Sequence, residues 1–470
     1  MRNAGISLSL ALGLAGCATA PAYRAPEVQV PAAFRETRDT VIETLVTRPA
    51  APDTLVWPDL GDSTLTRLLK AAVNANLDVR AAEARVRGAR AARTEAALDF
   101  APTVTFAGGY TRQRLSSASF PGFGAFPDQD IWDGGFDAFW ELDLFGRVRR
   151  NVQAQGAFVA VTQEDQRDIQ VFVAADLARA YFELRGAQEQ LSVAQRNGEN
   201  QRRTLQVTRQ RLDAGRGTAF DTERAQAQLS LTLASIPLLE SRVRQAQYQI
   251  GVLVGRPPAA IAAELEPVAA LPALPQAISV ANPDSVVRWR PDVAAAERAL
   301  AVERARVGAA KADYLPRITV EGSAGYSAAD FDGLGDRGTF RYAVGPVISW
   351  PALNLGRIKA RVDLSRAREA EAQAQYTQTV LRALEEVESS LVRYRTSRAQ
   401  VERIQEAAAA SERAAELARL RFSGGVADFL QVLDAERTQL EAQDQLAQGR
   451  TEAATAYAAL YKALGGTWPR

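Results

Sequence analysis

The side chains best suited to acid–base chemistry stand together at one place in the sequence. Glu141, Asp143 and Arg147 would supply two carboxylates and a positive neighbour, which is the composition of an acid–base site. The chain holds no histidine, the commonest general base and zinc ligand, and Met1 is its only methionine. Apolar residues alternate with these acids, which is typical of one face of a strand. We therefore expect no enzyme, no catalytic residue, and no cofactor-binding or metal site.

Cys17 is the only cysteine of the chain, and its position indicates that it carries lipid. Arg2 gives the chain a positive start, and residues 6–15 form an apolar stretch that is too short to span a bilayer as a helix. The run Leu14-Ala15-Gly16-Cys17 resembles the bacterial lipobox, which implies a signal peptide over residues 1–16 and a diacylated Cys17. The alternative is an ordinary signal peptide with an incidental cysteine.

The residues after Cys17 and the overall composition indicate where the protein is located and which classes of partner it binds. In lipoproteins of this kind, Ala18 after the cysteine implies delivery to the outer membrane, and the prolines of segment 17–62 favour an extended, lipid-anchored tether. The net charge is +1, so the basic excess that indicates nucleic-acid binding is missing. No later stretch has 18 uninterrupted apolar residues, so we expect no transmembrane helix.

An internal repeat organises the rest of the chain. Asp78-Val79 recurs as Asp292-Val293, and the strand end with Phe145-Gly146-Arg147 recurs as Leu355-Gly356-Arg357. We expect repeat 1 over 63–254, a linker rich in proline and alanine over 255–291, repeat 2 over 292–464 and a tail over 465–470. Each repeat is expected to contain a helix, two strands and two long helices, in that order. In repeat 1 these elements are expected at about 63–99 (helix), 103–112 and 132–144 (strands), and 147–213 and 219–253 (long helices). In repeat 2 they are expected at about 292–313 (helix), 317–327 and 339–350 (strands), and 357–423 and 427–464 (long helices).

The predicted strands alternate strictly between apolar and polar residues. Phe136 and Trp140 share one face of a strand, whereas Asp137 and Glu141 share the other. This pattern fits a soluble sheet with one buried face, or membrane strands with an apolar outer surface and a wet lumen. The signal peptide and the strand lengths favour the membrane. Four strands cannot close a barrel, so several chains are expected to combine.

The predicted long helices carry sustained heptads, which indicate coiled coils. A helix over 147–213 would be roughly 100 Å long, far longer than a globular helix. Each pair of long helices is joined by a short turn rich in glycine, which supplies the left-handed backbone of a tight connection. The turn residues are Gly215, Arg216 and Gly217 in repeat 1, and Gly424, Gly425 and Val426 in repeat 2.

With these motifs the chain resembles the outer-membrane efflux protein family, of the TolC and OprM type, from Cys17 to Trp468. The markers are the run Glu141-Leu142-Asp143-Leu144-Phe145-Gly146-Arg147, the run Arg290-Pro291-Asp292 at the start of the second half, the glycine turns, the run Val432-Leu433-Asp434-Ala435-Glu436 and the run Tyr461-Lys462-Ala463-Leu464-Gly465-Gly466. The resemblance implies an α+β membrane protein. In it, a homotrimer forms a 12-stranded transmembrane barrel with four strands per chain, and a coiled-coil tunnel continues the barrel into the periplasm. The resemblance further implies an equatorial collar around the tunnel, formed by about 28–60 of segment 17–62, the linker 255–291 and the carboxyl end.

The resemblance also implies a gate at the periplasmic tip. By motif match, Leu430 would form an apolar constriction and Asp434 a charged ring. Asp221 matches a position that pairs across helices in relatives. Its usual partners are replaced here by Phe422 and Ala427, so Arg421 or Arg216 is expected to substitute. The alternative for Asp434 is a solvated helix residue. The glycine turns would contact an adaptor.

The function implied is that of the outer-membrane channel of a tripartite efflux system, which lets small molecules such as drugs or toxic compounds leave passively. Its partners would be a periplasmic adaptor, an inner-membrane pump of the resistance-nodulation-division type, and outer-membrane lipid, with no nucleic acid. Two alternatives remain: an exit duct for proteins in type I secretion, or a lipid-anchored coiled-coil spacer of the envelope that does not conduct.

Overall fold

The computed structural model describes residues 28–38, 42–45, 57, 60–116, 118, 127–275 and 278–466. The expected signal peptide, Cys17 and most of segment 17–62 lie outside these residues. The chain forms two compact units. The described part of the first unit comprises residues 85–162 and 295–376, and the second comprises the described parts of 28–84, 163–294 and 377–470. None of the described helices is both long and apolar enough to cross a membrane.

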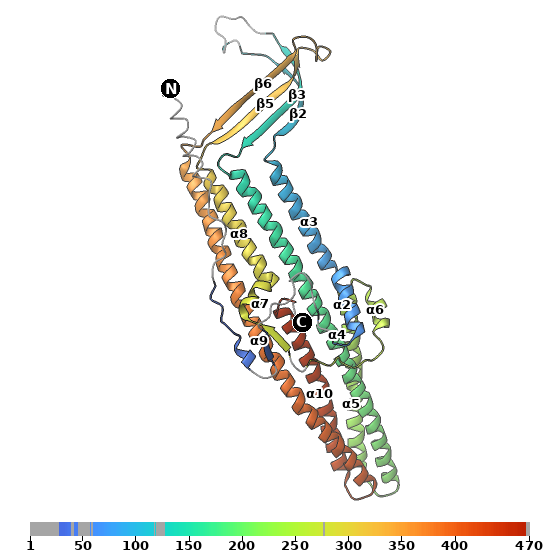
Figure 1. The fold of residues 1–470 in the computed structure, drawn as a ribbon. Coiled ribbons are helices and arrows are strands. Elements are labelled where there is room, and N and C mark those ends of the chain that lie inside the picture. Colours follow the sequence, from blue (N-terminus) through green and yellow to red (C-terminus); the bar gives the residue numbers. More distant parts are fainter. Residues whose placement is uncertain are drawn as a thin grey trace. The chain divides into compact units, whose positions relative to one another are not determined.

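The first unit contains one antiparallel sheet to which both repeats contribute two strands (Figure 1). The spatial order is β2-β3-β5-β6, so β3 of repeat 1 pairs with β5 of repeat 2. The strands are β2 (Thr103–Gln113), β3 (Gln129–Leu142), β5 (Arg317–Ala328) and β6 (Phe340–Ser349). Strand β3 begins three residues before the expected 132–144 and ends two residues before it. It ends at Leu142 because a turn follows, in which the Leu144 N–H donates to the Leu142 carbonyl with an N–O distance of 2.7 Å.

The register of this sheet separates apolar from polar side chains. Phe136 lies opposite Phe106 on one side and Ala324 on the other, and Ala324 in turn lies opposite Tyr342. The next position along β3, Asp137, belongs to the other face. The apolar face is not buried within the chain, since Tyr342 is 74% exposed and Phe106 64%. A soluble sheet would cover such a face, so this sheet has the make-up of a surface that contacts lipid or another protein.

The described part of the chain contains four long helices, which form two consecutive pairs along the sequence (Figure 1). Helices α4 and α9 belong to both units, whereas α5 and α10 lie in the second. Helix α4 is nearly twice as long as its partner α5, and α9 exceeds α10 in the same way. The bounds are α4 (Arg147–Asp213), α5 (Ala219–Leu253), α9 (Leu355–Ser423) and α10 (Phe429–Ala463).

The helix expected over 63–99 is two helices, α2 (Ser63–Ala75) and α3 (Leu77–Leu98). Asn76 separates them because its backbone is extended, with ψ at 135°. Its side-chain oxygen accepts from the backbone N–H groups of Asp78 and Val79, which caps α3. The corresponding helices in the second half of the chain are α7 (Pro283–Trp289), which lies within the segment expected as a linker, and α8 (Pro291–Ala312).

The segment 255–291, expected as a linker, also contains regular structure. Helix α6 (Pro258–Glu264) follows α5, and β4 (Ile278–Ala281) pairs in parallel with β1 (Ile42–Leu45). A short 3₁₀ helix, η1 (Arg35–Arg38), precedes β1. Three clusters of buried apolar side chains lie in the described part of the second unit: Tyr181 of α4 belongs to the first, Tyr394 and Tyr457 to the second, and Phe422 of α9 to the third.

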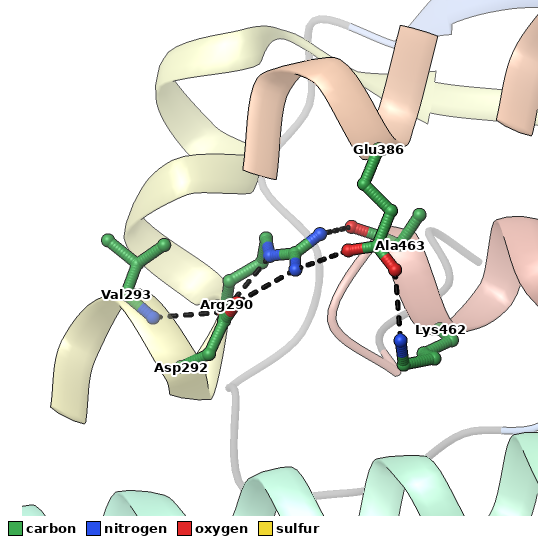
Figure 2. A network of polar contacts seen from close by, with 6 residues as sticks. All are labelled: Arg290, Asp292, Val293, Glu386, Lys462 and Ala463. Carbon is green, nitrogen blue, oxygen red and sulfur yellow. Dashed lines mark hydrogen bonds and ion pairs between the residues drawn. The ribbon is translucent and has the colours of Figure 1, made fainter. Parts of the chain in front are cut away.

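The two repeats hold the carboxyl ends of α5 and α10 by matching contacts made from different residues. The amide of Asn76 donates to the Leu253 carbonyl at 3.0 Å. In repeat 2, the Arg290 guanidinium donates to the Ala463 carbonyl at 2.6 Å (Figure 2). A cation thus stands where repeat 1 has a neutral amide.

The larger side chain of Arg290 also binds two acids. Its Nη2 lies 2.8 Å from Asp292 and 2.6 Å from Glu386, and Lys462 lies 2.9 Å from the other oxygen of Glu386. Figure 2 shows Arg290 between these acids. The Arg290 side chain is only 8% exposed. We call Arg290, Asp292, Glu386 and Lys462 the Arg290 network; it ties the start of repeat 2 to α9 and α10.

Asp168 of α4 provides a pH test of this region. Burial, with the repulsion of Asp292 next, raises the pKa of Asp168 to about 6; Asp165 also raises it, whereas Arg290 and Lys462 oppose the shift. An acid whose pKa is raised by folding holds its proton more tightly in the folded state, so it lowers stability as the pH rises from about 4 to about 6. We expect Asp168→Asn to gain about 1–2 kcal/mol in the free energy of unfolding above pH 6, and nothing below pH 4. Denaturant unfolding across this range measures it; equal gains at both ends would contradict the prediction.

Candidate functional site

The acid–base candidates form a structural joint where the sheet meets α4. Glu141 makes a two-pronged ion pair with Arg147, with N–O distances of 2.8 and 2.5 Å. Asp143 accepts from the backbone N–H groups of Val148 and Arg149 at 2.9 Å each, which satisfies the free donors at the start of α4. These contacts occupy both carboxylates. The trio therefore explains how strand becomes helix, and it offers no free acid–base pair.

The polar face of the sheet is an open, charged wall. Asp137 and Glu321 lie on it together with Phe139 and Thr105, around a hollow of about 730 Å³. An ion pair on this face joins Arg341 to Asp133, with an N–O distance of 3.4 Å. The groups differ in charge and size and do not converge on one point. In the described part of the chain, no three acidic, histidine or cysteine side chains gather in a way that could hold a metal ion.

The two turns that join α4 to α5 and α9 to α10 have similar structures. The Arg216 N–H donates to the Arg211 carbonyl at 2.8 Å, and the Val426 N–H donates to the Arg421 carbonyl at 2.9 Å. Gly215 and Gly425 have φ of +70° and +80°, the left-handed conformation of a helix end. Gly217 and Gly424 do not share this conformation. Val426 is 73% exposed, so this turn offers an apolar contact at its surface.

The expected gate residues lie at the start of α10. Leu430 is 46% exposed, whereas its neighbour Phe429 is buried in the tip. Asp434 is well exposed and pairs with Arg437 one turn along at 3.1 Å. Within the chain, both Leu430 and Asp434 are therefore available to a neighbouring molecule.

Asp221 does not contact the arginines expected to replace its usual partners. Its side chain accepts from the Thr218 hydroxyl at 2.7 Å, and the same hydroxyl accepts from the Asp221 N–H. This is a capping arrangement at the start of α5.

The comparison with known families decides the identity. The family described as "Outer membrane efflux protein" matches residues 68–256 and 283–466. The chain belongs to this family. Outer membrane protein OprJ of Pseudomonas aeruginosa is 31% identical over 99% of this chain and 96% of its own length. The toluene efflux pump outer membrane protein TtgF of Pseudomonas putida is 28% identical over 100% of this chain and 98% of its own.

A solved structure of the outer-membrane channel OprN supports the same assignment. It has a TM-score of 0.87 at 36% identity, and the match covers 96% of this chain and all of that one. The expected fold class and family are confirmed. The chain is an outer-membrane efflux channel that extends into the periplasm. Members of the outer membrane efflux protein family are channels rather than enzymes, which agrees with the occupied carboxylates at the joint.

Two side chains at the tip of this efflux protein have contacts that the sequence motifs do not predict. Arg211 of α4 contacts Phe422 of α9, and Glu436 of α10 is almost fully buried between Thr204 and Arg419. In the sequence, Arg211 is only the repeat counterpart of Arg421, and Glu436 is only the last residue of a family marker. Their contacts depend on helices that are distant in sequence.

Proposed function

We propose that this protein is the passive exit duct of a tripartite efflux system for small molecules. One observation carries the proposal: an antiparallel sheet with an exposed apolar face and a charged opposite face, in a chain of the efflux family. An apolar outer surface and a wet inner wall are what a lipid-embedded channel needs. The duct itself would perform no covalent chemistry and carry no cofactor apart from lipid. An inner-membrane pump, reached through a periplasmic adaptor, would supply the driving force.

Three copies of the chain would complete the channel. In the described chain, the edge strands β2 and β6 each pair on one side only. Edges with unpaired N–H and C=O groups cannot persist in lipid. Three sheets of four strands give a closed barrel of twelve, inside the range of known barrels, whereas one sheet alone cannot close.

The cargo proposed is small molecules of mixed polarity. Toluene in the name of the relative TtgF supports this class. The charged wall around Asp137 and Glu321 forms no pocket shaped for one compound. A protein-secretion duct is the second candidate, and it would pass polypeptides through the same wall. Acylation of Cys17 would add an anchor, since two acyl chains hold a protein stably on a membrane.

The tip would be the regulated end. Leu430 and Asp434 are exposed within the chain, which suits residues that meet their counterparts around a threefold axis. Three aspartates in one ring would repel, and they would attract cations. The turns with Gly215, Gly425 and Val426 would present the adaptor contact.

Conductance of the purified, full-length protein in planar bilayers tests this function. We expect native mass spectrometry in detergent to give three acylated chains, and bilayers to give discrete, low-conductance channels. Leu430→Ala and Asp434→Ala should raise the conductance severalfold, because each removes bulk or repelling charge from the constriction. Asp363→Ala, in the exposed i,i+4 pair with Lys359 of α9, is the matched control and should change nothing. A monomeric protein without conductance would contradict the proposed duct and favour the alternative of a lipid-anchored envelope spacer that does not conduct.

A further inference from the structure

The two helical hairpins of the second unit are joined at their ends by one arginine. Arg211 lies in the last turn of α4, which belongs to the first hairpin, and Phe422 lies in the last turn of α9, which belongs to the second. The centre of the Arg211 guanidinium lies 4.0 Å from the centre of the Phe422 ring. Its Nη2 also donates to the Phe422 carbonyl. The same side chain therefore holds both the ring and the backbone of the opposite hairpin.

The surroundings favour a cation at this point. The Phe422 carbonyl belongs to the free carbonyl groups at the end of α9, where the helix dipole is negative. The Phe422 ring is 6% exposed and packs on Phe429 at 5.8 Å, so it cannot turn away freely. A guanidinium over a buried ring is worth more than one in full solvent. Arg211 thus has two attractive partners and a fixed geometry.

The contact has no equivalent in the other direction. The repeat counterpart of Arg211 is Arg421, and the counterpart of Phe422 is Leu212, which has no ring. In repeat 1, Arg224 lies over Phe220 at 5.3 Å, but both belong to α5, so this pair joins nothing. Within the described residues, the arginine–aromatic link between the hairpins therefore runs in one direction, from α4 to α9.

A buried charge holds the same two hairpins farther from the turns. Glu436 of α10 is 4% exposed; it accepts from the Thr204 hydroxyl of α4 at 2.8 Å and pairs with Arg419 of α9 at 3.3 Å. Between the two contacts lies an apolar cluster to which all four helices contribute: Leu205, Ala225, Leu229, Phe422, Phe429 and Val432. The hairpins thus have a buried pivot at Glu436 and a releasable contact at Arg211.

We propose that Arg211 is the latch that holds the second hairpin, with Leu430 and Asp434, against the first. Asp221, which is occupied by its own cap, does not serve this purpose. Arg211 is a positioning residue: release of its guanidinium from Phe422 frees the end of α9 and the adjoining start of α10 to move about the Glu436 pivot. This role rests on the proposed function of the tip as the closed end of the duct.

The test compares variants of the purified, full-length protein in planar bilayers. We expect Arg211→Ala and Phe422→Leu each to raise mean conductance about fivefold or more. The reason is that loss of a desolvated cation–π contact shifts the ratio of open to closed channels by about that factor. The double variant should equal Arg211→Ala, because Phe422→Leu removes only the ring contact, which Arg211→Ala has already removed. Arg211→Lys keeps the charge but loses the planar stacking, so it should fall between the wild type and Arg211→Ala. Arg224→Ala is the matched control and should behave as the wild type.

The outcomes separate the latch from the function of the tip. If Leu430→Ala opens the channel while Arg211→Ala and Arg211→Lys do not, the latch is wrong and the gate stands. If Arg224→Ala raises conductance as much as Arg211→Ala, or the double variant shows additive effects, the latch is also wrong. If no variant, including Leu430→Ala, changes conductance, the proposed gate itself fails. The midpoint of thermal unfolding is measured for every variant. If Arg211→Ala does not assemble, the conductance of Phe422→Leu tests the latch in its place.

Discussion

Arg290→Met should lower the free energy of unfolding by about 3 kcal/mol. Removing the guanidinium leaves Asp292 and Glu386 without their shared cation, and it leaves the Ala463 carbonyl without its side-chain donor. Breaking one side of a buried ion pair costs about 3–5 kcal/mol. The lower end applies here because both acids are about a third exposed and Lys462 stays beside Glu386. Guanidinium unfolding of the detergent-solubilised protein, followed by circular dichroism, measures the change.

Arg179→Met is the matched control for this prediction. Arg179 also pairs with two acids, Asp176 and Glu183, at 2.6 and 2.7 Å, but its side chain is 42% exposed. Exposed pairs contribute about 0–1 kcal/mol, so the control should stay within that range. Equal losses for the two variants would show that burial of Arg290 does not matter, and the interpretation of the Arg290 network would be wrong.

Gly135→Val should prevent the pairing of the two repeats in the sheet. Gly135 lies opposite Gly325, and a Cβ added to it would meet the Ala324 carbonyl oxygen and the Gly325 Cα at 2.8 Å. Both obstacles are backbone atoms, so no side chain can rotate away. Overpacking of this kind costs about 1–3 kcal/mol or more, and here it acts on the strand pair that joins the repeats. We expect most of the protein to be lost from the outer-membrane fraction.

The neighbouring Gly134 is the control on the same strand. A Cβ at Gly134 meets nothing within 4 Å, because it points to the opposite face. Gly134→Val adds the same volume and the same β-branched side chain, and should assemble normally. The measurement is the amount of heat-modifiable protein in outer-membrane preparations. Normal assembly of Gly135→Val would mean that the strands are farther apart than in this structure.

Local patterns in the sequence were sufficient for several features. The alternation around Phe136 and Asp137 predicts which side chains share a face, because successive residues of any strand point to opposite sides. The heptads predict long helices, and α4 and α5 have the expected bounds. Gly215 and Gly425 mark the turns because a left-handed helix end needs a residue without a Cβ. Each of these signals depends on residues a few positions apart.

Other features required contacts between distant parts of the chain. The break at Asn76 depends on the Leu253 carbonyl, which holds the asparagine amide 177 residues away. Its counterpart Arg290 appeared only as part of a family motif, whereas the structure makes it the centre of the Arg290 network. The prediction that Arg421 or Arg216 replaces the partners of Asp221 followed sequence position alone, whereas the cap that Thr218 forms with Asp221 within the chain is visible only in the structure.

The repeat, the two faces of the strands, the lengths of the long helices and the turns can be predicted from local sequence patterns, since short-range periodicity and backbone sterics set each of them. Tertiary packing, in contrast, pairs β3 with β5, occupies Glu141 and Asp143 at a joint, and brings Arg211 to Phe422. The reason is physical: these contacts join residues whose approach depends on how whole helices and strands pack. A charged side chain in an amphipathic helix has the same sequence pattern whether it faces water or a buried ring.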